Sequence, residues 1–271
     1  MNGETIICAA MFLAASIPVA AQAPGIVDVL YAGSLVTPME GPVKSALRAQ
    51  GIDFQGQPGG SKALANLIAA GVKTPDVFIS VNPALVKGLG KRVAHAVTFG
   101  STSLGIGWSR MSPSAQMFAR VANGSMPLLE ALETPGLKIG RTDPQIDPKG
   151  QYTIEAMQLF AGPQSEQRIL GSDENNAQVF PEEDLLARVD AGEVDVGFFY
   201  RTEAVARGLR FIPLPGKAAL SDKITYTLAV MADAPHPAQA ERFADFMLRG
   251  EGKRILQKAG IDYLDLQKTS L

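Results

Sequence analysis

Short apolar runs alternate with helical patterns through the first third of the chain. Each run has the length of a buried strand, and each is followed by a stretch with the apolar spacing of an amphipathic helix. The predicted strands are Ile26–Tyr31, Asp53–Gln57 and Asp76–Ser80, and the predicted helices are Thr37–Ala49, Ser61–Ala70 and Pro83–Leu89. This alternation is typical of an α/β fold with a parallel sheet covered by helices on both faces. In such sheets, ligands bind at the carboxyl ends of the strands.

A second unit of the same kind follows, and the chain then returns to the first. A long extended stretch joins the two units. It is His95–Trp108, and the later predicted strands are Lys138–Arg141, Val194–Tyr200 and Thr225–Met231, with helices at Met126–Leu132, Gln151–Phe160, Pro181–Ala191 and Ala238–Arg249. The simplest architecture has two lobes that the chain crosses between twice, near Thr98 and Pro213. We therefore expect residues 24–97 and 214–271 to form lobe one and residues 98–213 to form lobe two.

Residues 1–23 are typical of a secretory signal peptide. The apolar run Ile6–Ala15 is followed by small residues, with cleavage expected after Ala21 or Ala23. The segment before this run is unusual because it contains Glu4 and no lysine or arginine. An uncleaved membrane anchor is the alternative, although the run falls short of a span of about 20 residues. We therefore expect a periplasmic protein, and because Cys8 is the only cysteine, the mature chain would have no disulfide.

The composition argues against a nucleic-acid partner. The chain has 271 residues, of which 46% are hydrophobic, 19% are charged and 7% are aromatic, and its formal net charge is −2. Nucleic-acid-binding proteins usually carry a basic surface and aromatic stacking residues, and this sequence has no basic block and few aromatics. We expect an ordinary globular protein that is a monomer.

Two serines lie where a predicted strand gives way to a helix. Ser34 follows the first strand and Ser61 follows the second, each directly after a glycine. A hydroxyl beside the free N–H groups of a helix N-terminus is suited to binding an anion. A single serine at such a position is often only a helix cap, which is the alternative for each. Two of them in one lobe favour an oxyanion site.

Several motifs follow one another along the mature chain. They are Ala32–Leu35, Gly59–Ala63, Asp76–Ser80, Asp143–Gly150 and the run from Ala191 to Arg201. In this order they resemble the molybdate/tungstate-binding proteins of ABC importers, and the archaeal-type branch of that family in particular. The resemblance implies the two-lobe periplasmic binding protein type II fold, with one dehydrated oxyanion held in the cleft between the lobes. It also implies an ABC permease in the inner membrane as the protein partner.

The resemblance implies which residues bind the anion. The serines that match Ser34 and Ser61 donate from lobe one. The loop that starts at Asp147, the helix start at Glu182 and the tyrosine that matches Tyr200 donate from lobe two. Glu182 would act through its backbone N–H, and a tyrosine that only packs at a strand end is the alternative for Tyr200. The resemblance implies no catalytic residue and no cofactor, since molybdate or tungstate is the ligand.

The chain departs from the archaeal-type pattern at Lys217. The archaeal-type proteins carry a glutamate there, and that glutamate and an aspartate matching Asp147 expand the metal of the anion to six-coordination. A buried carboxylate beside a dianion is costly unless it is neutralised. We therefore expect Lys217 to pair with Asp147 or to face the anion, and the ligand to stay tetrahedral. The alternatives are a solvated Lys217 and an Asp147 that only caps the helix beginning near Pro148.

Other functions have less support. An enzyme with Ser34 or Ser61 as nucleophile is the competing class, but neither serine lies in a Gly-x-Ser-x-Gly motif. The only histidines, His95 and His236, are far apart in the sequence, which disfavours a histidine base or a histidine metal site. The ligand-sensing domain of a regulator does not fit an export signal. Sulfate, thiosulfate or another small anion is the alternative ligand, because residue types do not give the size of a cavity.

Overall fold

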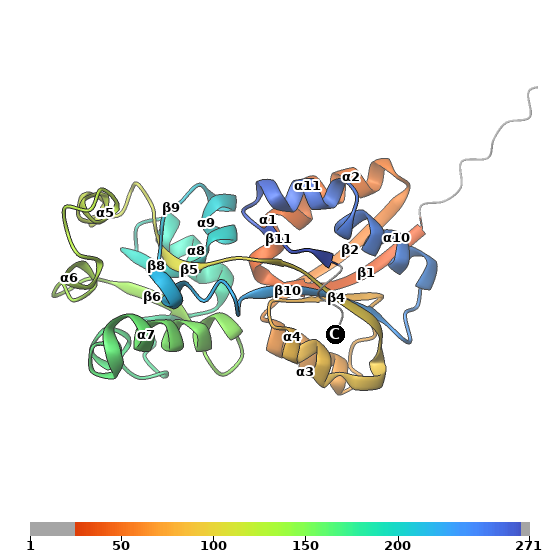
Figure 1. Cartoon of the computed structure of the whole chain (residues 1–271), viewed down its shortest axis with the longest axis horizontal. Coiled ribbons are helices and arrows are strands. Elements are labelled where there is room, and N and C mark those ends of the chain that lie inside the picture. Colours follow the sequence, from red (N-terminus) through yellow and green to blue (C-terminus); the bar gives the residue numbers. More distant parts are fainter. Residues whose placement is uncertain (1–24, 267–271) are drawn as a thin grey trace, which may run out of the picture.

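The chain forms two α/β lobes that lie side by side (Figure 1). The structure is a computed structural model that describes residues 25–266. Lobe one contains a six-stranded sheet in the order β11-β4-β10-β3-β1-β2, and lobe two a five-stranded sheet in the order β7-β6-β8-β5-β9. The predicted signal peptide and Cys8 lie outside the described residues.

The strands of both sheets are short. Those of lobe one are β1 (Gly25–Ala32), β2 (Ile52–Gly59), β3 (Val77–Ser80), β4 (Val93–Ser101), β10 (Thr225–Met231) and β11 (Asp262–Tyr263). Those of lobe two are β5 (Leu104–Trp108), β6 (Ile139–Thr142), β7 (Val179–Phe180), β8 (Val196–Tyr200) and β9 (Arg210–Pro213).

Helices pack on both sheets. Lobe one has η1 (Gly33–Leu35), α1 (Val36–Pro38), η2 (Met39–Val43), α2 (Lys44–Ala49), α3 (Ser61–Ala69), α4 (Pro83–Gly88), η3 (Gly90–Arg92), α10 (Pro237–Leu248) and α11 (Glu251–Lys258). Lobe two has α5 (Ala115–Ala122), α6 (Leu128–Leu132), α7 (Pro148–Leu170), α8 (Glu182–Asp190) and α9 (Arg201–Arg207), and η4 (Gly216–Ala219) lies in the returning segment. None of the helices in the described part of the chain is long and apolar enough to cross a membrane.

Both sheets are mixed, which corrects the prediction of a parallel sheet. Strands β1, β2 and β3 are parallel, as expected. Strand β10 runs antiparallel to β3 and β4, and β5 runs antiparallel to β8 and β9. The reason is the double crossing: β4 carries the chain toward lobe two and β10 brings it back beside β4, so the two must run in opposite directions.

The chain crosses between the lobes twice, after β4 and after β9. Strand β4 stays paired with β10 through Ser101, and β5 begins at Leu104, whereas the first crossing was expected near Thr98. The second crossing follows Pro213, at the end of β9. Helix η4 still packs against α7 and β5 of lobe two, so the chain rejoins the sheet of lobe one only with β10.

The predicted helix Thr37–Ala49 forms, with a wide π-type turn over η2. Pro42 lies in that turn. Because proline has no N–H, it cannot make the usual bond to the carbonyl four residues earlier, and a wider turn accommodates this. The side chains that face the core recur every four residues and are completely buried: Leu35, Met39, Val43 and Leu47. This spacing fixes η1 and the start of the helix at the end of β1.

Candidate functional site

Five of the six predicted site residues meet where the two lobes touch. They are Ser34, Ser61, Asp147, Glu182 and Tyr200, and all five are buried. Two glycines of lobe one permit the contact. A Cβ atom on Gly33 would lie 2.2 Å from Glu182 Oε2, and a Cβ atom on Gly60 would lie 3.0 Å from the carbonyl oxygen of Ile146.

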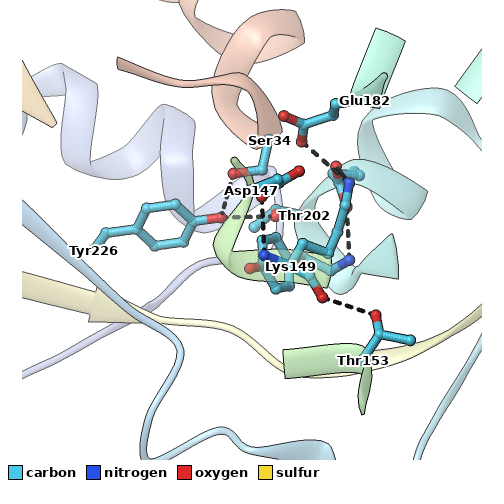
Figure 2. A network of polar contacts seen from close by, with 9 residues as sticks. Ser34, Asp147, Lys149, Thr153, Glu182, Thr202 and Tyr226 are labelled. Atoms are coloured by element: carbon cyan, nitrogen blue, oxygen red, sulfur yellow. Dashed lines mark hydrogen bonds and ion pairs between the residues drawn. The ribbon is translucent and has the colours of Figure 1, made fainter. Parts of the chain in front are cut away.

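Ser34 lies in η1, directly after β1. Its Oγ is 3.1 Å from the hydroxyl oxygen of Tyr226, and that hydroxyl is 3.0 Å from Thr202 Oγ1 (Figure 2). Helix η1 begins without a side-chain cap, so Ser34 does not serve as one. The alternative that this serine is only a helix cap is therefore not what the structure shows.

Ser61 begins α3, directly after β2. Its Oγ accepts the backbone N–H of Val81 at 3.2 Å, which ties the helix to the chain just beyond β3. Because the oxygen acts as acceptor in this bond, the hydroxyl proton stays available to a ligand. The start of α3 also leaves backbone N–H groups without helical partners. Both serines thus lie at the carboxyl ends of neighbouring parallel strands.

Asp147 is the N-cap of α7. Its Oδ1 accepts the backbone N–H of Lys149 at 2.9 Å, so the capping role considered from the sequence is present. Burial raises the pKa of this carboxyl to about 6, and the nearby charge of Glu182 adds to the rise while the ammonium of Lys149 opposes it. Asp147 is therefore mostly ionised at neutral pH and takes up a proton as the pH falls toward about 6.

Lys149 lies at the centre of the buried charges, and the sequence reading overlooked it. Its side chain is completely buried, and Nζ lies 3.2 Å from Glu182 Oε1 (Figure 2). Nζ is in closer contact with Glu203 Oε1. Burial alone would lower the pKa of this ammonium, but the carboxylates of Glu182 and Glu203 outweigh burial and raise it. Lys149 thus stays charged, and its Nζ lies 5.6 Å from the ring centre of Tyr200.

One sequence signal could have revealed Lys149. It lies in the first turn of α7, where a positive charge opposes the helix dipole. A lysine at such a position needs compensation from acidic groups elsewhere in the fold. Its partners lie 33 and 54 residues away along the chain, so only the fold shows them.

Glu182 begins α8, and its side chain lies against Gly33 of lobe one. Burial raises the pKa of its carboxyl well above the usual range; Lys149 opposes this rise, and Glu203 adds to it. The backbone N–H groups at the start of α8 point along the helix axis toward the same region, as those of any helix N-terminus do. Glu182 therefore brings both a donor through its backbone and a carboxyl through its side chain.

Tyr200 ends β8 and caps α9. Its hydroxyl is buried, and within residues 25–266 it has no hydrogen-bond partner. Burial, together with the charge of Asp147, raises the pKa of this hydroxyl, so it remains a donor. Leaving such a group unsatisfied costs about 1–3 kcal/mol, which an oxygen of a bound ligand would offset.

Lys217 does not reach the other five residues. It lies exposed on η4, and no ion pair joins it to Asp147 in the described part of the chain. The ammonium that compensates Asp147 belongs to Lys149. The short η4 turns the Lys217 side chain toward solvent because Ala218 and Leu220 take the buried positions.

A cleft opens beside this cluster. Its volume is about 900 Å³, and it is lined by Gly60 and Ala63 of lobe one and by residues of lobe two that include Asp143, Asp147 and Glu182. Within residues 25–266, the side-chain partner of the Ser34 hydroxyl is the hydroxyl of Tyr226, whose pKa is raised by burial, and not a base that would activate the serine. The site is suited to donating hydrogen bonds rather than to covalent chemistry.

Family comparison identifies the class of protein. A family model described as bacterial extracellular solute-binding protein matches residues 27–262. The chain belongs to this family. Membership confirms the predicted class, a binding protein and not an enzyme. The five predicted site residues that meet between the lobes all lie inside the matched region.

Several relatives have names that state a ligand, the following two among them. A Haloferax volcanii protein with the provisional name of an ABC transporter molybdenum-binding protein is 30% identical over 200 residues, which cover 72% of this chain and 62% of that protein. The molybdate/tungstate-binding protein of Pyrococcus abyssi is 28% identical over 107 residues, which cover 31% of each chain. The chain thus spans less than two thirds of either relative. These matches confirm the resemblance that the motifs indicated.

Solved structures show the same fold. The periplasmic molybdate-binding protein of Azotobacter vinelandii aligns with a TM-score of 0.68 and 15% identity, covering 88% of this chain and 100% of that one. The sulfate-binding protein SubI of Mycobacterium tuberculosis aligns with a TM-score of 0.64 and 16% identity, covering 89% and 88%. These matches confirm the predicted two-lobe type II fold, and at such identities they do not choose the anion.

Proposed function

We propose that this solute-binding protein captures molybdate or tungstate between its lobes and delivers it to an ABC permease. The observation that carries the proposal is the convergence of buried hydroxyl donors from both lobes, Ser34 and Ser61 from lobe one and Tyr200 from lobe two. The starts of α3 and α8 add backbone N–H groups and the positive ends of two helix dipoles. The names of the two relatives support molybdate and tungstate as the ligands.

The carboxyl groups of the site would repel a bound anion if all of them were ionised. Asp147, Glu182 and Glu203 outnumber the single ammonium of Lys149. A dianion beside them requires that Asp147 or Glu182 take up a proton, and the raised pKa values of both carboxyls are in the direction that makes this easy. Once one of these carboxyls is protonated, the site holds the anion by hydrogen bonds alone. The anion then stays tetrahedral and needs no bond from its metal to a carboxylate.

A periplasmic location and a monomeric state complete the proposal. The signal-like segment at residues 1–23 supports export, and the extracellular solute-binding family supports a place outside the cytoplasm. The protein needs no cofactor for this task, since the oxyanion is its cargo. Residue Lys217, exposed on η4, would touch the anion only if the returning segment moved when the lobes close.

Titration calorimetry with molybdate, tungstate, sulfate, thiosulfate and phosphate tests the function. We expect one molybdate or tungstate per chain, bound more tightly than the other anions. Ser34→Ala and Ser61→Ala should each weaken binding by about 1.5–3 kcal/mol, because a buried charged acceptor loses a donor. Ser112→Ala is the control, since this serine is equally buried but its hydroxyl only accepts the N–H of Ser114. Tighter binding of sulfate than of molybdate, or no binding at all, would contradict the proposal.

A further inference from the structure

A chain of three hydroxyl groups joins the two lobes at the site. The Tyr226 hydroxyl lies between Ser34 Oγ of lobe one, at 3.1 Å, and Thr202 Oγ1 of lobe two, at 3.0 Å (Figure 2). All three side chains are buried, with exposed fractions of 4% for Ser34, 0% for Tyr226 and 1% for Thr202. Water therefore does not compete for these protons.

The number of protons fixes what this chain can do. Each hydroxyl has one proton, and the two contacts consume two of the three. If Thr202 donates to Tyr226 and Tyr226 donates to Ser34, the free proton is that of Ser34. If the direction is reversed, Ser34 spends its proton on Tyr226 and has none for a ligand. An anion that accepts from Ser34 therefore selects one direction for the whole chain.

We propose that Tyr226 is a positioning residue that orients the Ser34 hydroxyl toward the anion and links this orientation to Thr202 of lobe two. The inference rests on the proposed function, because it needs an anion at Ser34. Tyr226 does not touch the anion, and it acts through Ser34. The bond from Thr202 makes the favourable direction depend on the two lobes being together.

The surroundings of Tyr226 suit this role. Tyr226 lies at the start of β10 and pairs with Gly100 of β4, close to the first crossing. Its ring stacks on Phe99 at a centroid distance of 6.2 Å, which fixes the hydroxyl in place. Burial raises the pKa of this hydroxyl, and the charges of Glu203 and Glu182 on the lobe two side act in the same direction. Tyr226 therefore keeps its proton and can donate it to Ser34.

Removing one hydroxyl tests the proposal. Tyr226→Phe keeps the ring and its packing but removes the buried hydrogen bond that orients Ser34, the donor to the anion. We expect molybdate affinity to fall about tenfold. Tyr263→Phe is the matched control, because this hydroxyl donates to the Met247 carbonyl within lobe one, away from the cleft. Its affinity should stay within about twofold of that of the unchanged protein.

A double-mutant cycle separates positioning from general weakening of the fold. If Tyr226 acts through Ser34, then Tyr226→Phe should cost less than about twofold in a Ser34→Ala background. The same tenfold loss in both backgrounds, or no loss in either, would overturn the proposal.

Thr202→Val tests the other end of the chain of hydroxyls and also covers the case in which Tyr226→Phe does not fold. We expect about a fivefold loss of affinity, and Thr202→Ser should restore it because serine replaces the donor. A Thr202→Val variant that binds like the unchanged protein would overturn the link to lobe two. If the unchanged protein binds none of the anions, the proposed function itself fails, which the same titrations show directly.

Discussion

Lys149 is the residue on which the buried charges of lobe two depend. Its ammonium contacts both Glu182 and Glu203, and all three side chains are almost fully buried. We expect Lys149→Met to lower the free energy of unfolding by about 3–5 kcal/mol, because it leaves two carboxyls buried without their cation. Urea denaturation measures this. Lys217→Met, which removes an exposed lysine, is the matched control and should change stability by less than about 0.5 kcal/mol. Equal effects of the two variants would show that the buried network is not important for stability.

Asp147 should make stability depend on pH. Burial raises the pKa of its carboxyl from 3.8 to about 6, so the folded state holds a proton that the unfolded state releases. The stabilisation of the folded state by the protonated Asp147 is fully present below pH 3.8 and is lost as the pH rises through about 6. Asp147→Asn, which can still cap α7, should flatten the pH dependence of the unfolding free energy between these values. An unchanged slope would mean that other groups dominate.

Residue types and order pointed to five residues that the structure places where the lobes meet, whereas the other members of the cluster depend on long-range packing. Ser34 and Ser61 lie together because the parallel strands β1 and β2 place their carboxyl ends at one edge of the sheet. Tyr200 ends β8 in the sheet of lobe two, so its place beside them depends on how the two lobes pack. Tyr226 could not be found in this way, since it lies 192 residues from Ser34 on a strand whose neighbours are set by the double crossing. The Lys217 pairing failed for a similar reason, because a nearer ammonium serves Asp147.

At the scale of elements, the sequence predicted the alternating strands and helices but missed three α-helices of the described chain. They are α5, α9 and α11. Helix α9 follows β8 without a loop, and Tyr200 both ends the strand and caps the helix, so no turn signal separates them. Helix α11 follows α10 after only Arg249 and Gly250, which the sequence pattern does not distinguish from the end of one helix.

The contact between η1 and α8 depends on the absence of a side chain at Gly33. A Cβ atom there would lie 2.2 Å from Glu182 Oε2, so Gly33→Ala should displace the buried Glu182 side chain. We expect molybdate affinity to fall about tenfold or more, because donors on the two lobes no longer fit one anion. Gly41→Ala is the control, since a Cβ atom there meets nothing within 4 Å. That variant should bind normally and gain about 0.5–1 kcal/mol in stability. Normal binding by Gly33→Ala would contradict the close fit of η1 and α8.

At the scale of the whole molecule, the cleft is far larger than a tetrahedral anion. A volume of about 900 Å³ beside the donors leaves room for the lobes to approach further. The segments at Thr102–Ser103 and after Pro213 are the two connections about which they would turn. Because the anion would accept hydrogen bonds from both lobes, it should shift the population toward a closed state. Small-angle scattering should show a smaller radius of gyration with saturating molybdate than without it. Equal radii would contradict closure by the anion.

The most direct test of anion capture between the lobes is a crystal structure with molybdate, measured at the molybdenum absorption edge. Anomalous scattering locates the metal independently of the fitted side chains. We expect one strong peak per chain, with its oxygens in hydrogen-bonding reach of Ser34, Ser61 and Tyr200 and with four oxygen neighbours around the metal. A peak at another surface, or none at saturating molybdate, would contradict the account. Six oxygen neighbours, with a carboxylate among them, would show that the expected tetrahedral geometry is wrong.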